Sequence, residues 1–105
     1  MSSTELLPRP MTIEEFQPLL GKTIVAECSP KNADLTLAEV TPLKDHGVVA
    51  RPPFILIFHS DHMIQLTAGI YALRSGRFGP AAVYLEPTGA LPNAVPGNYY
   101  QAVFN

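Results

Sequence analysis

The chain has 105 residues and a formal net charge of -2, so it lacks the concentrated basic stripe of a nucleic-acid-binding protein. Only 15% of the residues are charged while 47% are hydrophobic, a composition that excludes a disordered tail. One cysteine, Cys28, excludes a disulfide-stapled module, and the longest strongly apolar run, residues 54–58, is far shorter than the ~20 residues of a membrane helix. We therefore expect one compact cytoplasmic domain with no cofactor and with no nucleic-acid or membrane partner.

Residues 1–11 are polar and contain prolines, and they predict a flexible leader in front of a single β-rich domain over residues 12–105. A helix is predicted to begin at Thr12, because Thr12 and Glu15 have the spacing of a capping box. Three apolar residues then share one helical face: Ile13, Phe16 and Leu20. A proline and a glycine follow closely, so the helix is predicted to be short.

After the helix, the apolar residues alternate with a period of two, which is typical of β-strands. The predicted strands are residues 23–28, 35–40, 54–59, 69–75, 82–86 and 99–104. Most of the 11 prolines fall between these segments, where proline ends ladder pairing and blunts strand edges. Short turns favour an antiparallel meander. We expect a mainly β fold, a small antiparallel six-stranded barrel or sandwich with one short N-terminal helix over an open end or edge.

The loop after the third predicted strand carries candidate metal ligands. His59, Asp61 and His62 combine two imidazoles and a carboxylate, which are ligand types for zinc or iron. Their spacing lacks the i, i+4 histidines and the intervening glutamate of the zincin motif. A polar loop that ends an apolar strand explains the same residues. The three therefore stay weak metal candidates.

Few other residues suggest chemistry. Cys28 lies at the end of a predicted strand, where a small buried hydrophobe is favoured over a nucleophile. Glu27, Glu39 and Glu86 each lie on a predicted strand. They mark the solvent side of half-buried strands, or, inside a barrel, they form an acid and base pair. No catalytic residue is assigned, and we expect a protein that is not an enzyme.

The strongest predicted strand is apolar on both faces, so both faces need a cover. Alternation places Phe54, Leu56 and Phe58 on one face and Ile55 and Ile57 on the other. The barrel interior covers one face, and the N-terminal helix or another subunit covers the other. Four tyrosines form a second candidate surface or are simply strand residues: Tyr71, Tyr84, Tyr99 and Tyr100. The predicted interface residues are Phe54, Leu56, Phe58, Tyr99 and Tyr100.

Several motifs stand out together in chain order. They are Phe16-x-x-Leu19-x-Gly21, Leu35-x-Leu37-x-Glu39-Val40, Pro53-Phe54 with Phe58, Gly69-x-Tyr71, Tyr84-Leu85-Glu86-Pro87 and Tyr100-Gln101-Ala102-Val103-Phe104-Asn105. With these motifs, residues 11–105 resemble a family of small bacterial domains of similar length that has no assigned function. The resemblance implies an accessory encoded beside phage-tail-like proteins, and it supplies no catalytic residue. It does not mark the histidine loop as a family site.

Two functions are compatible with these observations. The first is a non-catalytic protein-interaction or assembly module, accessory to a phage-tail-like structure, which binds a protein partner or self-associates. The alternative is a small-ligand-binding β-barrel, or a metal-dependent enzyme, with His59, Asp61 and His62 at the mouth of a cavity. The first is favoured because no complete catalytic constellation is found in the sequence.

Overall fold

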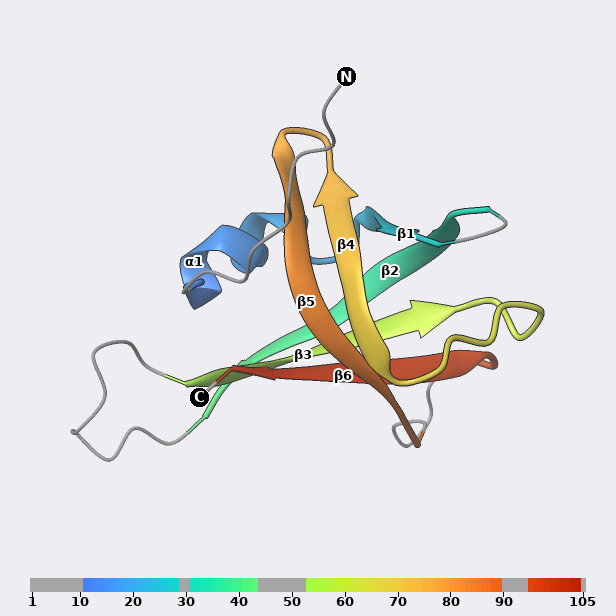
Figure 1. Cartoon of the computed structure of the whole chain (residues 1–105). Helices are drawn as coiled ribbons and strands as arrows, with labels where there is room; N and C mark the ends of the chain where they lie inside the picture. The colour runs from blue at the N-terminus through green and yellow to red at the C-terminus, as the bar shows by residue number, and fades with distance from the viewer. Residues whose placement is uncertain (1–10, 29–30, 44–52, 90–94, 105) are drawn as a thin grey trace, which may run out of the picture.

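The computed structural model describes residues 11–28, 31–43, 53–89 and 95–104 (Figure 1). A short helix, α1 (Ile13–Phe16), continues into a 3-10 turn, η1 (Gln17–Leu19). Within the described residues the strands are β1 (Thr23–Glu27), β2 (Ala33–Pro42), β3 (Phe54–Ser60), β4 (Gly69–Ser75), β5 (Phe78–Thr88) and β6 (Asn98–Phe104). These elements confirm the predicted mainly β fold with one short helix near the N-terminus.

The six described strands close into an antiparallel barrel in the order β1-β2-β3-β6-β5-β4. The barrel is confirmed, but the expected meander is wrong, because β3 pairs with β6 and β4 pairs with β1. This connectivity is of the Greek-key type. The meander was expected from short turns, whereas residues 61–68 are long enough to carry the chain from β3 to a strand that is not its neighbour.

The helix begins as its capping box predicts, because the backbone N–H of Thr12 donates to the Glu15 carboxylate at 2.9 Å. The helix tightens to 3-10 geometry at Gln17–Leu19, and Gly21 then adopts a φ of 82°. A 3-10 turn has three residues per turn, so the 3.6-residue spacing no longer holds. Leu20, predicted on the apolar face, is consequently 52% exposed.

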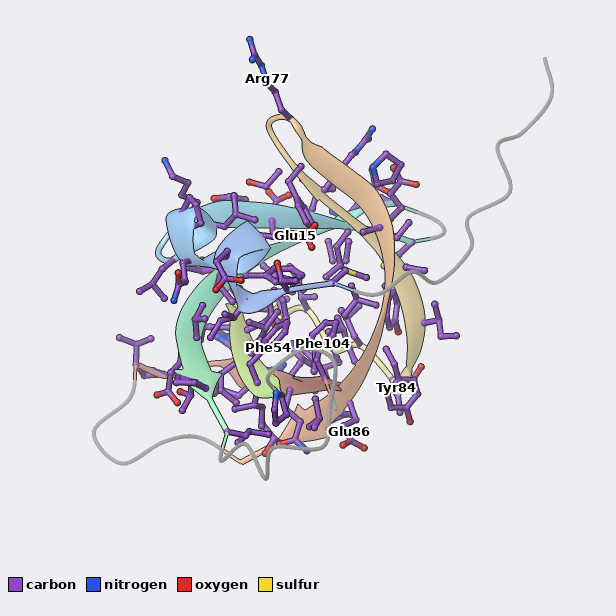
Figure 2. The ribbon with its side chains drawn as sticks, turned by 90° about the vertical axis from the view of Figure 1, so that its left-hand side faces the viewer. Glu15, Phe54, Arg77, Tyr84, Glu86 and Phe104 are labelled. Carbon is purple, nitrogen blue, oxygen red and sulfur yellow. The ribbon has the colours of Figure 1, made fainter. Side chains whose placement is uncertain are left out.

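The barrel interior is filled by apolar side chains from all six described strands. Fully buried members are Ile24, Leu35, Leu37, Phe54, Leu56, Phe58, Leu73, Leu85 and Tyr100. Phe16 of α1 lies over one end, with its ring centroid 5.8 Å from Phe54, 5.1 Å from Phe78 and 5.6 Å from Phe104. Figure 2 shows Phe54 and Phe104 inside the ring of strands, beside the helix. The helix therefore closes one barrel end, as expected.

This position also settles which part of β3 the helix covers. Phe54 is on the inner face of β3, so the helix packs over the end of that face and not over the outer face that carries Ile55 and Ile57. Met11, predicted as the last leader residue, belongs to the buried core, and residues 1–10 lie outside the described residues. No helix among the described residues is long and apolar enough to cross a membrane.

Candidate functional site

The three metal candidates do not come together. The Nε2 atom of His59 lies 2.9 Å from the carbonyl oxygen of Pro96, and the His59 ring packs on Tyr99 with centroids 5.0 Å apart. Asp61 and His62 lie beyond the strand end, 3.5 Å apart, with both side chains mostly in solvent. Within the described residues, no three His, Cys, Asp or Glu side chains are grouped so that they could hold a metal ion. In this fold His59 anchors the chain before β6.

The five predicted interface residues belong to the barrel. Phe54, Leu56, Phe58 and Tyr100 point inward and are at most 1% exposed. The first three alternate along β3 on its inner face, and Phe58 is paired with Tyr100 across β3 and β6. Tyr99 points outward, but it is only 4% exposed, and its hydroxyl donates to the carbonyl oxygen of Val95 at 2.7 Å. These side chains are buried by contacts within the chain, so they are not available to contact a partner.

The barrel end opposite the helix is closed by polar contacts. The Tyr100 hydroxyl donates to the carbonyl oxygen of Ile64 at 3.1 Å and accepts the N–H of Leu66 at 3.2 Å. The Ser60 hydroxyl lies 3.1 Å from the Tyr100 hydroxyl, and the Asn98 amide donates to the same Ile64 carbonyl at 2.6 Å. This cluster, the polar lock (Ser60, Tyr100, Asn98, Ile64 and Leu66), fixes the chain between β3 and β4.

Two hollows flank the segment that the polar lock holds. One, of about 590 Å³, lies between this segment, the end of β5 and the start of β6. The other, of about 460 Å³, lies between the segment and the turn from β1 to β2, beside Cys28. Neither hollow is lined by His59, Asp61 or His62. The expected cavity with these residues at its mouth is therefore not formed by either hollow.

The outer wall of the barrel carries exposed apolar side chains. Ile70 and Tyr84 are directly paired across β4 and β5 and are 66% and 53% exposed. Val103 of β6 is 44% exposed and is paired with Ile55 of β3. We call these four residues the outer apolar strip. Figure 2 shows Tyr84 on the outside of β5, on the same side as Glu86.

Register relates the two halves of this strip. Glu86 and Gln101 are paired across β5 and β6, and the Gln101 amide donates to Glu86 Oε1 at 2.8 Å. Tyr84 precedes Glu86 by two residues and Val103 follows Gln101 by two, so both lie on the outer face toward the same end of this pair. The strip thus has two paired parts, Ile70 with Tyr84 on β4 and β5 and Val103 with Ile55 on β6 and β3, and the pairing between β5 and β6 ends at Glu86 and Gln101, between the two parts.

The three strand glutamates lie on the outer wall, which fits the first of the two predicted roles. Glu27 forms an ion pair with Arg74 at 3.2 Å. Glu39 and Glu86 instead accept hydrogen bonds from neutral groups, Thr41 Oγ1 at 2.9 Å and the Gln101 amide. Among the described residues, neither of these two carboxylates has an ion-pair partner. Asp34, an exposed residue of β2 on the same wall, also has no ion-pair partner among the described residues.

The sequence contained a signal for the strip that the prediction did not use. Residues two apart on a strand share a face, so Arg74 marks the solvent face of β4 and Ile70 must share it. In the same way, Glu86 marks the outer face of β5 and places Tyr84 on it. Tyr84 is predicted only as one of four strand tyrosines, and Ile70 is not among the predicted surface residues.

Comparisons with known proteins give one match. No curated protein and no solved structure is significantly similar to this chain. A family of domains without an assigned function, described as "Domain of unknown function (DUF6916)", matches residues 11–104. The match covers almost the whole chain and includes every described element, which confirms the resemblance to an uncharacterised small domain family. The chain belongs to the DUF6916 family of domains of unknown function.

Proposed function

We propose that this chain is a non-catalytic protein-interaction module that binds a partner protein through the outer apolar strip. The observation that carries the proposal is the exposure of Ile70, Tyr84 and Val103 on the wall of a closed barrel. Exposed apolar groups gathered on one surface favour protein contact, and tyrosine suits an interface because its ring is apolar and its hydroxyl is polar. The strands that carry them belong to one hydrogen-bonded wall, so the surface is preorganised.

Two features of the described residues support binding over catalysis. The described barrel interior is filled by apolar side chains, and its polar side-chain contacts lie at one end, in the polar lock. Cys28, the one possible thiol nucleophile, donates to the carbonyl oxygen of Ala26 at 3.4 Å and has no histidine partner among the described residues. A nucleophile needs a neighbouring base or a lowered pKa to react.

The family resemblance suggests the type of assembly in which this interaction module would act. It implies an accessory of a phage-tail-like assembly, made in the cytoplasm, where the strip would attach to a larger protein or to a second copy of the chain. A small rigid barrel with an exposed strip suits such a role, because it can join an assembly without changing its own fold. The gene neighbourhood of the chain identifies which proteins to test as partners.

The test is co-expression of the chain with each product of its neighbouring genes, followed by purification of the complex. The double variant Ile70→Ser with Tyr84→Ser should weaken the complex at least tenfold. The matched control is Leu20→Ser, which alters an exposed apolar residue after η1, away from the strip. A complex that tolerates the double variant as well as it tolerates the control would overturn the proposed surface, and the absence of any complex would overturn the assembly role.

A second candidate function is the binding of a small uncharged ligand. The 590 Å³ hollow supports it, because its volume lies within the usual range for ligand sites, and its lining includes Gln65, Thr88 and Asn98 but no charged side chain. The test is nuclear magnetic resonance with the labelled chain and a set of uncharged fragments. Saturable shift changes at Thr88 and Asn98 would support the candidate, and shift changes confined to other regions, or none, would reject it.

A further inference from the structure

We infer that the partner binds by adding an extended segment to the edge of β5 at Tyr84, where the barrel wall is incompletely paired. This inference rests on the proposed function, and it specifies the kind of partner and how it binds. The place concerned is the seam between β5 and β6, which we define by Tyr84 of β5 and Val103 of β6. The seam lies between the two paired parts of the outer apolar strip.

The pairing of β5 with β6 stops at Glu86 and Gln101. Two residues further along, the same register would place Tyr84 opposite Val103, but these two residues are not paired. Figure 1 shows that β5 meets β6 near the end of β5 and stands away from it over its first half. Tyr84 is 53% exposed and Val103 is 44% exposed. The seam is therefore an exposed place where two strands of the barrel face each other without being paired.

The backbone of β5 shows which residues direct their hydrogen-bonding groups into the seam. A Cβ added to Gly79 would overlap the carbonyl oxygen of Leu73 and lie 3.1 Å from the Ala81 nitrogen, so this carbonyl of β4 points toward β5 beside Ala81. Leu73 and Ala81 are paired, and this is the geometry of a hydrogen-bonded pair. Such pairs alternate along an antiparallel ladder, so residues 83 and 85 also face β4. The N–H and C=O of Tyr84 consequently face the other way, into the seam.

These backbone groups of Tyr84 have no partner among the described residues. Pro80 faces the same side of β5 and has no N–H, which is typical of a strand edge. Ala82, between them, is only 8% exposed, so the accessible part of this edge is centred on Tyr84. An unpaired N–H and C=O on an exposed strand edge are a template for pairing with another chain. The seam thus calls for an occupant whose own backbone can pair with Tyr84.

The expected segment is short and contains β-branched or aromatic residues. Strand addition takes its affinity from main-chain hydrogen bonds and its specificity from alternate side chains. The partner residue opposite Tyr84 would share its outer face, and would extend the Ile70–Tyr84 pair by one strand. β-Branched and aromatic side chains pack best beside such a neighbour. The edge of β5 and the outer apolar strip would therefore bind the same segment.

Other occupants fit the seam less well. A second copy of the chain would offer the same edge of β5, which is exposed at Tyr84 and buried at Ala82, so two rigid copies would meet through one residue each. Nucleic acids and lipid headgroups lack N–H and C=O groups that alternate at the spacing of a strand. An extended segment of another protein can enter at Tyr84 and pair its backbone there. The unpaired backbone thus favours a protein segment as the occupant.

The first measurement is amide hydrogen exchange of the isotope-labelled full chain by nuclear magnetic resonance. We expect the Tyr84 amide to exchange at least tenfold faster than the amides of Val83 and Leu85, which face β4. The chain is then titrated with the synthetic peptide acetyl-KTVTVTK-amide. The comparison peptide, acetyl-KTPTPTK-amide, keeps the length and the charge but replaces both valines by proline, which does not pair as a strand. The valine peptide alone should shift the Tyr84 amide and slow its exchange.

Two variants of Tyr84 separate its backbone from its side chain. Tyr84→Pro removes the edge N–H, and the matched control, Tyr84→Val, changes the side chain but keeps this N–H. Tyr84→Pro should bind the valine peptide about fivefold more weakly than Tyr84→Val, which corresponds to one hydrogen bond. Val103→Pro alters the facing strand, β6, and should bind the valine peptide like the wild type.

Several outcomes would overturn the inference: a Tyr84 amide that is protected in the free chain, equal shifts with the two peptides, equal binding by the two Tyr84 variants, or no shift at millimolar peptide. A loss confined to Val103→Pro would overturn it in favour of the edge of β6. Concentration-dependent shifts at Tyr84 without peptide would overturn it in favour of a second copy. The exchange and the titration use the wild-type chain, so they decide the question even if Tyr84→Pro does not fold.

The same variants separate this inference from the proposed function. A neighbouring-gene partner that is lost with Ile70→Ser and Tyr84→Ser but binds Tyr84→Pro and Tyr84→Val equally well would keep the strip as the interface and reject strand addition. A partner that tolerates both the serine double variant and Tyr84→Pro would reject the strip and strand addition together.

Discussion

The two ends of the barrel are closed by opposite chemistry. At the helix end, the Phe16 ring meets three other phenylalanine rings, and Phe54 and Phe104 stack with centroids 4.5 Å apart. At the other end, the polar lock joins Ser60, Tyr100 and Asn98 to backbone groups of the segment after β3. Apolar contact tolerates small shifts, whereas hydrogen bonds need defined partners.

The two ends of this small barrel are therefore expected to contribute differently to its stability. The aromatic end buries large rings, so its contribution to the free energy of unfolding is large and comes from area. The polar end contributes less net free energy, but it fixes one conformation of a loop that carries exposed residues such as Met63. We expect substitutions at the first end to lower global stability and substitutions at the second to loosen the segment locally.

The largest expected effect is that of Phe16→Ala at the aromatic end. Phe16 is fully buried, and its removal leaves a cavity among three rings, so the free energy of unfolding should fall by about 3–5 kcal/mol. Urea denaturation followed by circular dichroism measures the loss. The control is Leu20→Ala, on the exposed residue that follows η1, which should cost less than about 0.5 kcal/mol. Similar losses for the two variants would contradict the role of Phe16.

Local signals in the sequence predict the aromatic end well. Thr12 and Glu15 set the start of the helix, and Gly21 lies where the helical region ends. Such signals act over a few residues, so they can be read without knowing the fold. The positions of the strands follow from alternation in the same way, although β5 starts at Phe78, earlier than predicted, because the turn before it is shorter.

The polar end and the outward position of Glu39 depend on contacts that are distant in sequence. The pairing of β3 with β6 joins His59 to Tyr99, and alternation within a strand does not specify its partner. Ser60 and Tyr100 meet only through that pairing. The bulge that turns Glu39 outward is marked by neither glycine nor proline. The candidate metal ligands form no site for a related reason. His59 contacts Pro96 and Tyr99, whereas Asp61 and His62 lie beyond the end of β3 with their side chains mostly in solvent.

The next largest effect is expected for Gly97→Ala, which strains the polar end. Gly97 has a φ of 141°, and an added Cβ would overlap the His59 ring nitrogen and the Ser60 carbonyl oxygen. Backbone strain and this overlap should cost about 2–3 kcal/mol of unfolding free energy. Thermal and urea denaturation measure it, with Gly89→Ala as the control, because a Cβ there meets no atom within 4 Å. Equal stability of the two variants would rule out this close approach.

A smaller effect is expected for Tyr100→Phe, which removes one hydroxyl from the polar lock. The Leu66 N–H then loses its acceptor, and the stability should fall by about 1–2 kcal/mol. Hydrogen exchange should accelerate at Leu66 while the amides of Phe54 and Phe104 keep their protection. The control is Tyr71→Phe, whose hydroxyl bonds to Thr67 in an exposed position. Uniform acceleration over the barrel would show that the two ends do not differ as described.

The smallest effect on stability is expected for substitutions in the outer apolar strip, which are compared here with substitutions at the two barrel ends. Ile70 and Tyr84 are mostly exposed, so Ile70→Ser with Tyr84→Ser should change the free energy of unfolding by less than about 1 kcal/mol in sum. Urea denaturation measures the change, and the same variant is the one expected to lose a partner. A residue pair that matters for binding and not for folding distinguishes a docking surface from a structural one. A large loss of stability would instead make Ile70 and Tyr84 part of the fold, and it would remove the main support for the proposed interface.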